Sequence, residues 1–186
     1  MKKICVLLLV AAMALSMMAC AKGPDANQTT GTTTEATKAP LTDSLETIIE
    51  KITTEQPVEF AHMTQALDLT DTSEDGMWAL KSFTGLDNAD LIKEAAVFEP
   101  MMGSLAFSMV LVRVKDASNA QTVAEQMKAG IDPRKWICVE ANDIMAAGYG
   151  DVIMFIMLDN NSSLTAQSFV DAFQTVCGNE LDFVLK

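Results

Sequence analysis

The stretch Val152-Ile153-Met154-Phe155-Ile156-Met157-Leu158 decides the fold. Its seven consecutive residues are all apolar, so neither a strand nor a helix formed by them would have a polar face. The run is also shorter than an ordinary buried helix. Turn-forming residues bound it, with Gly148-Tyr149-Gly150-Asp151 before it and Asp159-Asn160-Asn161 after it. The pattern predicts a central strand that is covered on both faces, or by sheet neighbours and a helix layer.

The segments around this run predict the rest of a sheet. Residues 143–147 and 152–158 flank Gly148-Tyr149-Gly150 as the two strands of a hairpin. Ser104–Val114 predicts a second strong strand, whose length and mixed faces suit a position beside the central one. A shorter strand is predicted from Ala95 to Glu99.

Further segments carry apolar residues at helical spacing behind capping residues. The predicted helices are 41–52 with a capping box of Asp43 and Glu46, 71–83 with one of Asp71 and Glu74, 116–129 capped by Asp116, and a last one from Ser162 or Ser163 to Gly178. Strands joined by hairpins with helices to one side predict an α+β fold. The expected architecture is a two-layer sandwich, a mainly antiparallel sheet with its helices packed on one side.

The first residues are typical of a secretory signal. Lys2 and Lys3 form a positive start, Val6–Leu15 is an apolar run too short for a comfortable membrane span, and small residues lead to Cys20. The pattern predicts a lipoprotein signal peptide over residues 1–19.

Cys20 is the predicted site of lipid attachment. Ala19 precedes it as the small residue of a lipobox, although Met17 stands where Leu is usual. The thiol would be joined to a diacylglycerol, because two acyl chains anchor a protein that one chain would not. Ordinary secretion with cleavage near Ala19 or Ala21 is the alternative.

Residues 20–40 are expected to be a disordered tether that begins at the lipidated cysteine. This Thr-rich segment has no aliphatic side chain larger than Ala apart from Pro, so nothing in it gains by burial. Residues 41–186 are then long enough for one α+β domain with a sizeable core.

Charge narrows the choice of partners. The chain has 186 residues and a net charge of −12, and loss of Lys2 and Lys3 makes it more negative still. Nucleic-acid binding is disfavoured, because phosphate neutralisation needs a basic surface. The expected partners are the membrane, reached through the N-terminal lipid, and an envelope protein or small ligand, and the protein would lie on the outer face of the cytoplasmic membrane. No cofactor is expected.

Several blocks from about Leu80 onward resemble a known family. They are Phe83–Asp87, Arg113–Ala117, Lys135–Val139 and Gly150–Met157. They are similar to a domain-of-unknown-function family of small Gram-positive bacterial lipoproteins, which also share the signal and tether. The resemblance implies an envelope location and a single domain, and it brings no activity with it.

Two cysteines remain after Cys5 in the signal and Cys20 at the anchor. Cys138 and Cys177 suggest a disulfide in a protein outside the cytoplasm. The predicted path of the chain puts them at opposite ends of the central strand, roughly 20 Å apart and beyond disulfide reach. We therefore expect two small buried hydrophobic residues, with a disulfide as the alternative.

A possible metal site lies at the start of the predicted helix 71–83. Asp71, Ser73, Asp75 and Gly76 match the first half of an EF-hand calcium loop. The twelfth position, which should supply a bidentate carboxylate, is Ser82. A helix cap made by Asp71 and Glu74 explains the same residues, so no metal site is expected and these three side chains stand as weak candidates.

No set of residues points to catalysis. His62 is the one histidine, and no Gly-x-Ser-x-Gly turn presents a nucleophile. Trp78 and Trp136 are expected in the core rather than on a carbohydrate platform, and Met101-Met102 is expected to fill the core.

The sequence thus favours a lipid-anchored extracytoplasmic module that binds or assists something at the cell envelope without enzymatic activity. An envelope hydrolase of unrecognised type and a calcium-responsive module are the alternatives.

Overall fold

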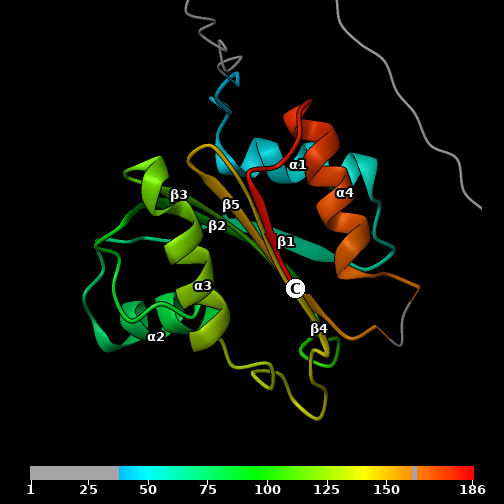
Figure 1. Cartoon of the computed structure of the whole chain (residues 1–186). Helices are drawn as coiled ribbons and strands as arrows, with labels where there is room; N and C mark the ends of the chain where they lie inside the picture. Colours follow the sequence, from blue (N-terminus) through cyan, green and yellow to red (C-terminus); the bar gives the residue numbers. More distant parts are fainter. Residues whose placement is uncertain (1–37, 161–162) are drawn as a thin grey trace, which may run out of the picture. The chain divides into compact units, whose positions relative to one another are not determined.

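The seven-residue apolar run forms β5 (Val152–Leu158), which lies between β3 (Phe107–Val114) and β4 (Asp143–Tyr149). The structure, a computed structural model, describes residues 38–160 and 163–186 (Figure 1). Within these residues the chain forms an antiparallel sheet of six strands in the order β1-β2-β3-β5-β4-β6. The remaining strands are β1 (His62–Ala66), β2 (Ile92–Pro100) and β6 (Phe183–Leu185).

The predicted hairpin is confirmed. Tyr149 of β4 pairs with Val152 of β5, so Gly150 and Asp151 form a two-residue turn. Gly150 has a φ of 58°, the left-handed conformation that such tight turns require and that glycine adopts without strain. Every residue of β5 is buried, which confirms its central place.

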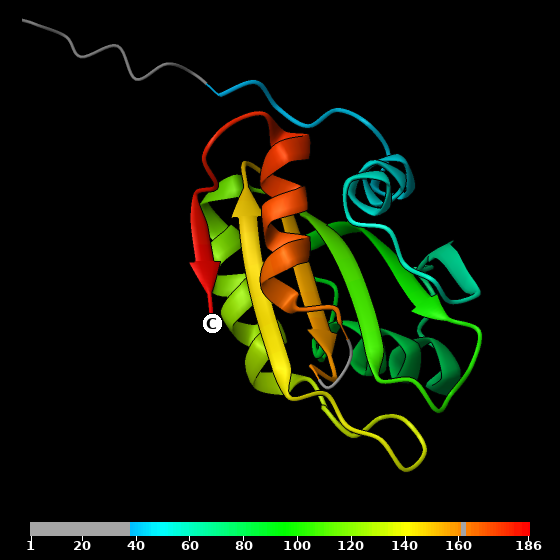
Figure 2. The ribbon, with the colours of Figure 1, turned by 90° about the vertical axis from the view of Figure 1, so that its right-hand side faces the viewer.

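Helices cover both faces of the sheet (Figures 1 and 2). One face carries α1 (Leu45–Glu55) and α4 (Ala166–Cys177), and the other carries α2 (Glu74–Thr84) and α3 (Ala120–Gly130). The α+β class with an antiparallel sheet is confirmed, but the expected single helix layer is wrong. β3 and β5 are buried throughout, so both of their faces need a cover.

The two faces build separate cores because successive side chains of a strand point to opposite sides. Met154 and Ile156 of β5 pack with α1 and α4, whereas Ile153, Phe155 and Met157 pack with α3. The sheet therefore divides the interior into an α1/α4 core and an α2/α3 core.

Helix ends differ from the predicted caps. Ser44, rather than Asp43 with Glu46, caps α1, and its hydroxyl accepts a hydrogen bond from the amide of Thr47 at 3.2 Å. Ser73, rather than Asp71 with Glu74, caps α2 in the same way.

The later helix starts are also displaced. Asp116 caps η1 (Ala117–Asn119), a short 3₁₀ turn that leads into α3. Thr165 caps α4 in place of Ser163, and Ser162 lies outside the described residues.

The predicted signal peptide over 1–19, the lipid site Cys20 and most of the predicted tether lie outside the described residues. The tether was expected to reach Pro40, but Lys38 and Ala39 already bond to the fold. Asp182 and Tyr149 supply the polar partners of these bonds, Asp182 to the ammonium of Lys38 and Tyr149 to the carbonyl of Ala39.

The sheet has two distinct ends. We call the end with Lys38, Arg113 and the Gly150–Asp151 turn the attachment end, because the chain enters the fold there. The opposite, distal end holds the β2–β3 turn and the loop 131–142, beyond the pair formed by Phe107 and Leu158. Both views place the entering chain and these loops at opposite ends (Figures 1 and 2).

Candidate functional site

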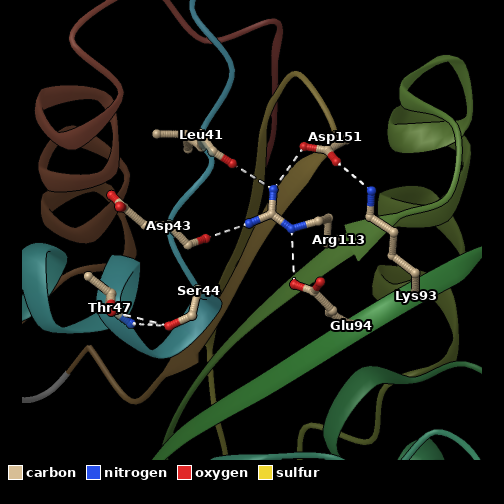
Figure 3. Close-up of polar contacts among 8 residues, drawn as sticks. All are labelled: Leu41, Asp43, Ser44, Thr47, Lys93, Glu94, Arg113 and Asp151. Atoms are coloured by element: carbon tan, nitrogen blue, oxygen red, sulfur yellow. Dashed lines mark hydrogen bonds and ion pairs between the residues drawn. The ribbon is translucent and has the colours of Figure 1, made fainter.

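A buried arginine organises the attachment end (Figure 3). Arg113 lies near the end of β3 on the α1/α4 face, and its side chain is only 8 % exposed. Its guanidinium donates to the carbonyl oxygens of Leu41 and Asp43, both at 2.7 Å. It also donates to the carboxylates of Glu94, at 3.0 Å, and Asp151, at 3.1 Å.

The charges of this cluster balance one another. The second oxygen of Asp151 accepts a hydrogen bond from Lys93 at 3.0 Å, so two cations face the carboxylates of Asp151 and Glu94. An anionic ligand would have to displace these carboxylates. The arrangement therefore holds the backbone of residues 41–43 against the sheet. The rigid, planar guanidinium suits this role because it presents several donors in a fixed geometry.

A second group of contacts holds the chain just before this point. Lys38 pairs with Asp182 at 2.6 Å and lies over the ring of Tyr149, 5.3 Å from its centre. The hydroxyl of Tyr149 donates to the carbonyl of Ala39 at 2.9 Å. We call residues 38–44, which these contacts and Arg113 fix to the sheet, the strap.

Asp182 links the strap to the hairpin turn. One of its oxygens accepts from Lys38, and the other accepts from the amide of Gly150 at 2.7 Å. Partial burial alone would raise the pKa of Asp182, but these hydrogen bonds outweigh it and the pKa is lowered. The hydrogen bond between Lys38 and Asp182 raises the pKa of Lys38.

Two hollows flank the Arg113 cluster. One, of about 530 Å³, lies between the start of α1 and the ends of β1 and β2, with Asp68, Lys93 and Glu94 among its lining residues. The other, of about 520 Å³, lies beside the strap and the hairpin turn. Both are open, and their charged groups include the ion pairs described above.

The calcium candidates form a helix cap instead of a loop of ligands. The carboxylate of Asp71 accepts from the amide of Ser73 at 2.9 Å, and the hydroxyl of Ser73 accepts from the amide of Gly76 at 3.2 Å. Hydrogen bonds from the hydroxyl and amide of Ser73 lower the pKa of Asp71. Asp75 follows in the first turn of α2, and the described residues contain no group of three or more His, Cys, Asp and Glu side chains that could hold a metal ion.

The two cysteines differ in their surroundings. Both are free thiols, Cys177 buried at the end of α4 and Cys138 exposed in the loop 131–142. The expectation that Cys138 is buried is wrong, because the segment 136–139 lies outside the sheet. Burial, followed by the nearby charge of Asp182, raises the pKa of Cys177 to about 12.

Several apolar residues expected in the core lie at the surface. Trp78 is 67 % exposed on α2, and Met101 and Met102 are 69 % and 54 % exposed. The two methionines follow Pro100, where β2 ends, so they belong to a turn and not to a strand. Trp136 is partly buried against Lys135, and His62 is exposed with its Nδ1 3.1 Å from the carbonyl of Phe60.

A buried lysine at the distal end was not predicted. Lys135 pairs with Glu99 at 2.5 Å, contacts the carbonyl of Ser82 at 3.2 Å, and lies over the ring of Phe83. Burial lowers the pKa of Lys135, and attraction to Glu99 offsets only part of that effect. These contacts fix the loop 131–142 to β2 and α2.

The Arg113 cluster gives a first prediction. Replacing Arg113 with Met removes the donors to Leu41 and Asp43 and leaves Glu94 and Asp151 without their shared cation, so we expect the free energy of unfolding to fall by about 2–4 kcal/mol. Urea unfolding measures the loss, and amide exchange should increase in residues 41–48. The control is Arg134→Met, whose exposed pair with Glu140 is worth about 0–1 kcal/mol. Equal losses in both variants would contradict the conclusion that Arg113 holds the backbone of residues 41–43 against the sheet.

The raised pKa of Cys177 gives a second prediction. Above pH 9 the unfolded chain releases the thiol proton while the folded chain keeps it to about pH 12, so stability is lost as the pH rises across this range. Unfolding free energies of the wild type and Cys177→Ala are compared at pH 8 and pH 11. The wild type should lose more between these two values, and identical losses would show that the thiol is not desolvated.

Comparison of the chain with protein-family models, with curated proteins and with solved structures gives no match. Over residues 38–160 and 163–186, no helix has both the length and the apolar character needed to cross a membrane.

Proposed function

We propose that the chain is a lipid-anchored extracytoplasmic module without enzymatic activity, held to the cell envelope at one end and binding a protein partner at the other. The observation that carries this proposal is the difference in structure between the two ends of the sheet. The strap is bonded at the attachment end, and large apolar side chains are exposed at the distal end.

The strap supports the anchoring part of the proposal. It begins within the last three residues of the predicted tether, and it is bonded through Lys38 and through the carbonyls of Ala39, Leu41 and Asp43. The lipobox pattern ending at Cys20 and the resemblance to small lipoproteins support the same conclusion.

The distal end supports the binding part. Met101, Met102 and Ile137 are exposed, with Ile137 at 75 %, and the amide of Ile137 donates to the carbonyl of Gly103 at 3.2 Å, which joins the two loops. The buried pair of Lys135 and Glu99 fixes the base of the loop. Because these contacts already fix the backbone of the loop, a partner would not have to order that backbone, and exposed apolar side chains offer it surface to bury.

The anchor is tested in intact cells. The wild-type chain should appear in the membrane fraction with the mass of a diacylglyceryl group on Cys20, and Cys20→Ser should lose both the added mass and membrane retention. Cys138→Ser, which removes a thiol elsewhere, is the matched control and should behave as the wild type. An unacylated chain found in the cytosol with its first twenty residues retained would refute the anchor.

The binding surface is tested with a photo-reactive amino acid placed at Ile137 in intact cells. We expect adducts of increased mass at this position and far fewer at Glu125, an exposed residue of α3 away from the distal end. The expected difference follows from the exposed apolar surface of the two joined loops. Equal labelling from the two positions, or none from either, would contradict a partner at the distal end.

A further inference from the structure

The outer edge of β1 is open. The amide of Leu67 donates to the carbonyl of Ala95, and the amide of Met101 donates to the carbonyl of Ala61, each at 2.9 Å. These two bonds fix which residues of the strand bond to β2, since the pattern alternates along an antiparallel ladder. Ala61, Met63, Gln65 and Leu67 therefore face β2, and the backbone groups of the intervening residues face away from the sheet.

Those outward-facing backbone groups belong to His62, Thr64 and Ala66. All five residues of β1 are exposed, and no other part of the described chain bonds to this edge. β1 contains neither a charged residue nor a proline, the two devices that commonly keep an edge strand from pairing. β6, at the other edge of the sheet, has three residues and offers a shorter ladder (Figure 2).

We propose that β1 pairs antiparallel with β1 of a second copy of this chain, centred on Thr64. In this register Thr64 faces Thr64 of the second copy, and His62 faces its Ala66. All outward amides and carbonyls of both strands are then bonded, and the two sheets become one. Registers centred on Met63 or Gln65 would use fewer of these groups inside the strands, so hydrogen bonding selects the register.

Charge favours a second copy over the cationic partner that an acidic chain would otherwise attract. The strand itself offers no carboxylate to a basic peptide. Just beyond it, the proposed register places Asp68 opposite Phe60 and Glu59 opposite Leu69 of the second copy. No acidic residue then faces another, so two strongly acidic chains can meet here without direct repulsion.

Side chains gain from the same register. Met63 is 46 % exposed in the single chain, and it would pack beside Gln65 of the second copy on the α2/α3 side of the sheet. The pairing uses neither the strap nor the distal loops, so it is independent of the anchor and of the partner proposed above.

The test is disulfide trapping in the full chain, in a Cys138→Ser background. Paired Cα atoms in an antiparallel ladder are about 4.5–5.5 Å apart, within disulfide reach, whereas a residue two positions out of register is roughly 8 Å from its copy. Thr64→Cys should therefore shift to twice the chain mass under mild oxidation. Met63→Cys and Gln65→Cys should each remain single alone, and should cross-link when the two variants are mixed.

Three outcomes would overturn the proposal. Absence of the Thr64→Cys product would show that β1 does not pair in this register. Equal self-linking of all three variants would indicate random collision or a parallel arrangement. Cross-linking of the Cys138→Ser background without a new cysteine would assign the product to another thiol. An unacylated Cys20 would itself be a free thiol, so the variants are repeated in a Cys20→Ser, Cys138→Ser background, where the same pattern is expected whether or not the anchor proposal holds.

Discussion

The whole architecture depends on the need to cover both faces of the two central strands. Every side chain of β3 and β5 is buried, so water must be excluded from each side of the sheet. A single helix layer would leave one of those faces wet, and the cost scales with the exposed apolar area. The chain therefore places α1 and α4 on one face and α2 and α3 on the other. The edges of the sheet and the loops at its two ends are then the parts that remain available for contacts with other molecules.

Local signals in the sequence predicted most of the elements but less of their arrangement. The run 152–158 and its glycine turn identified the central hairpin, because seven apolar residues between turn formers fit few alternatives. The second helix layer was missed, since helical spacing gives the apolar side of a helix and not the sheet face that it will cover. The caps shifted by one to three residues. At α1, Asp43 and Ser44 can both act as a cap, and only the backbone conformation selects Ser44.

The attachment end could not have been predicted from spacing. Arg113 bonds to carbonyl groups of Leu41 and Asp43, about seventy residues earlier, and backbone carbonyls carry no sequence signature. One signal was present, a single charged residue, Arg113, in a strand that is otherwise uncharged, where a buried charge must find partners. Lys135 is similar, since its burial depends on contacts with α2 and β2 that only the folded chain creates.

The order of contacts along the strap determines how the domain responds to mechanical load. A pull applied to the chain before Lys38 reaches the Lys38 contact first, then the carbonyl of Ala39, and only later those of Leu41 and Asp43. These contacts would break one after another along the chain, because the force acts on each of them in turn. Each broken contact would free a residue or two of the strap and leave the pairing of the strands unchanged, because none of these contacts belongs to the sheet.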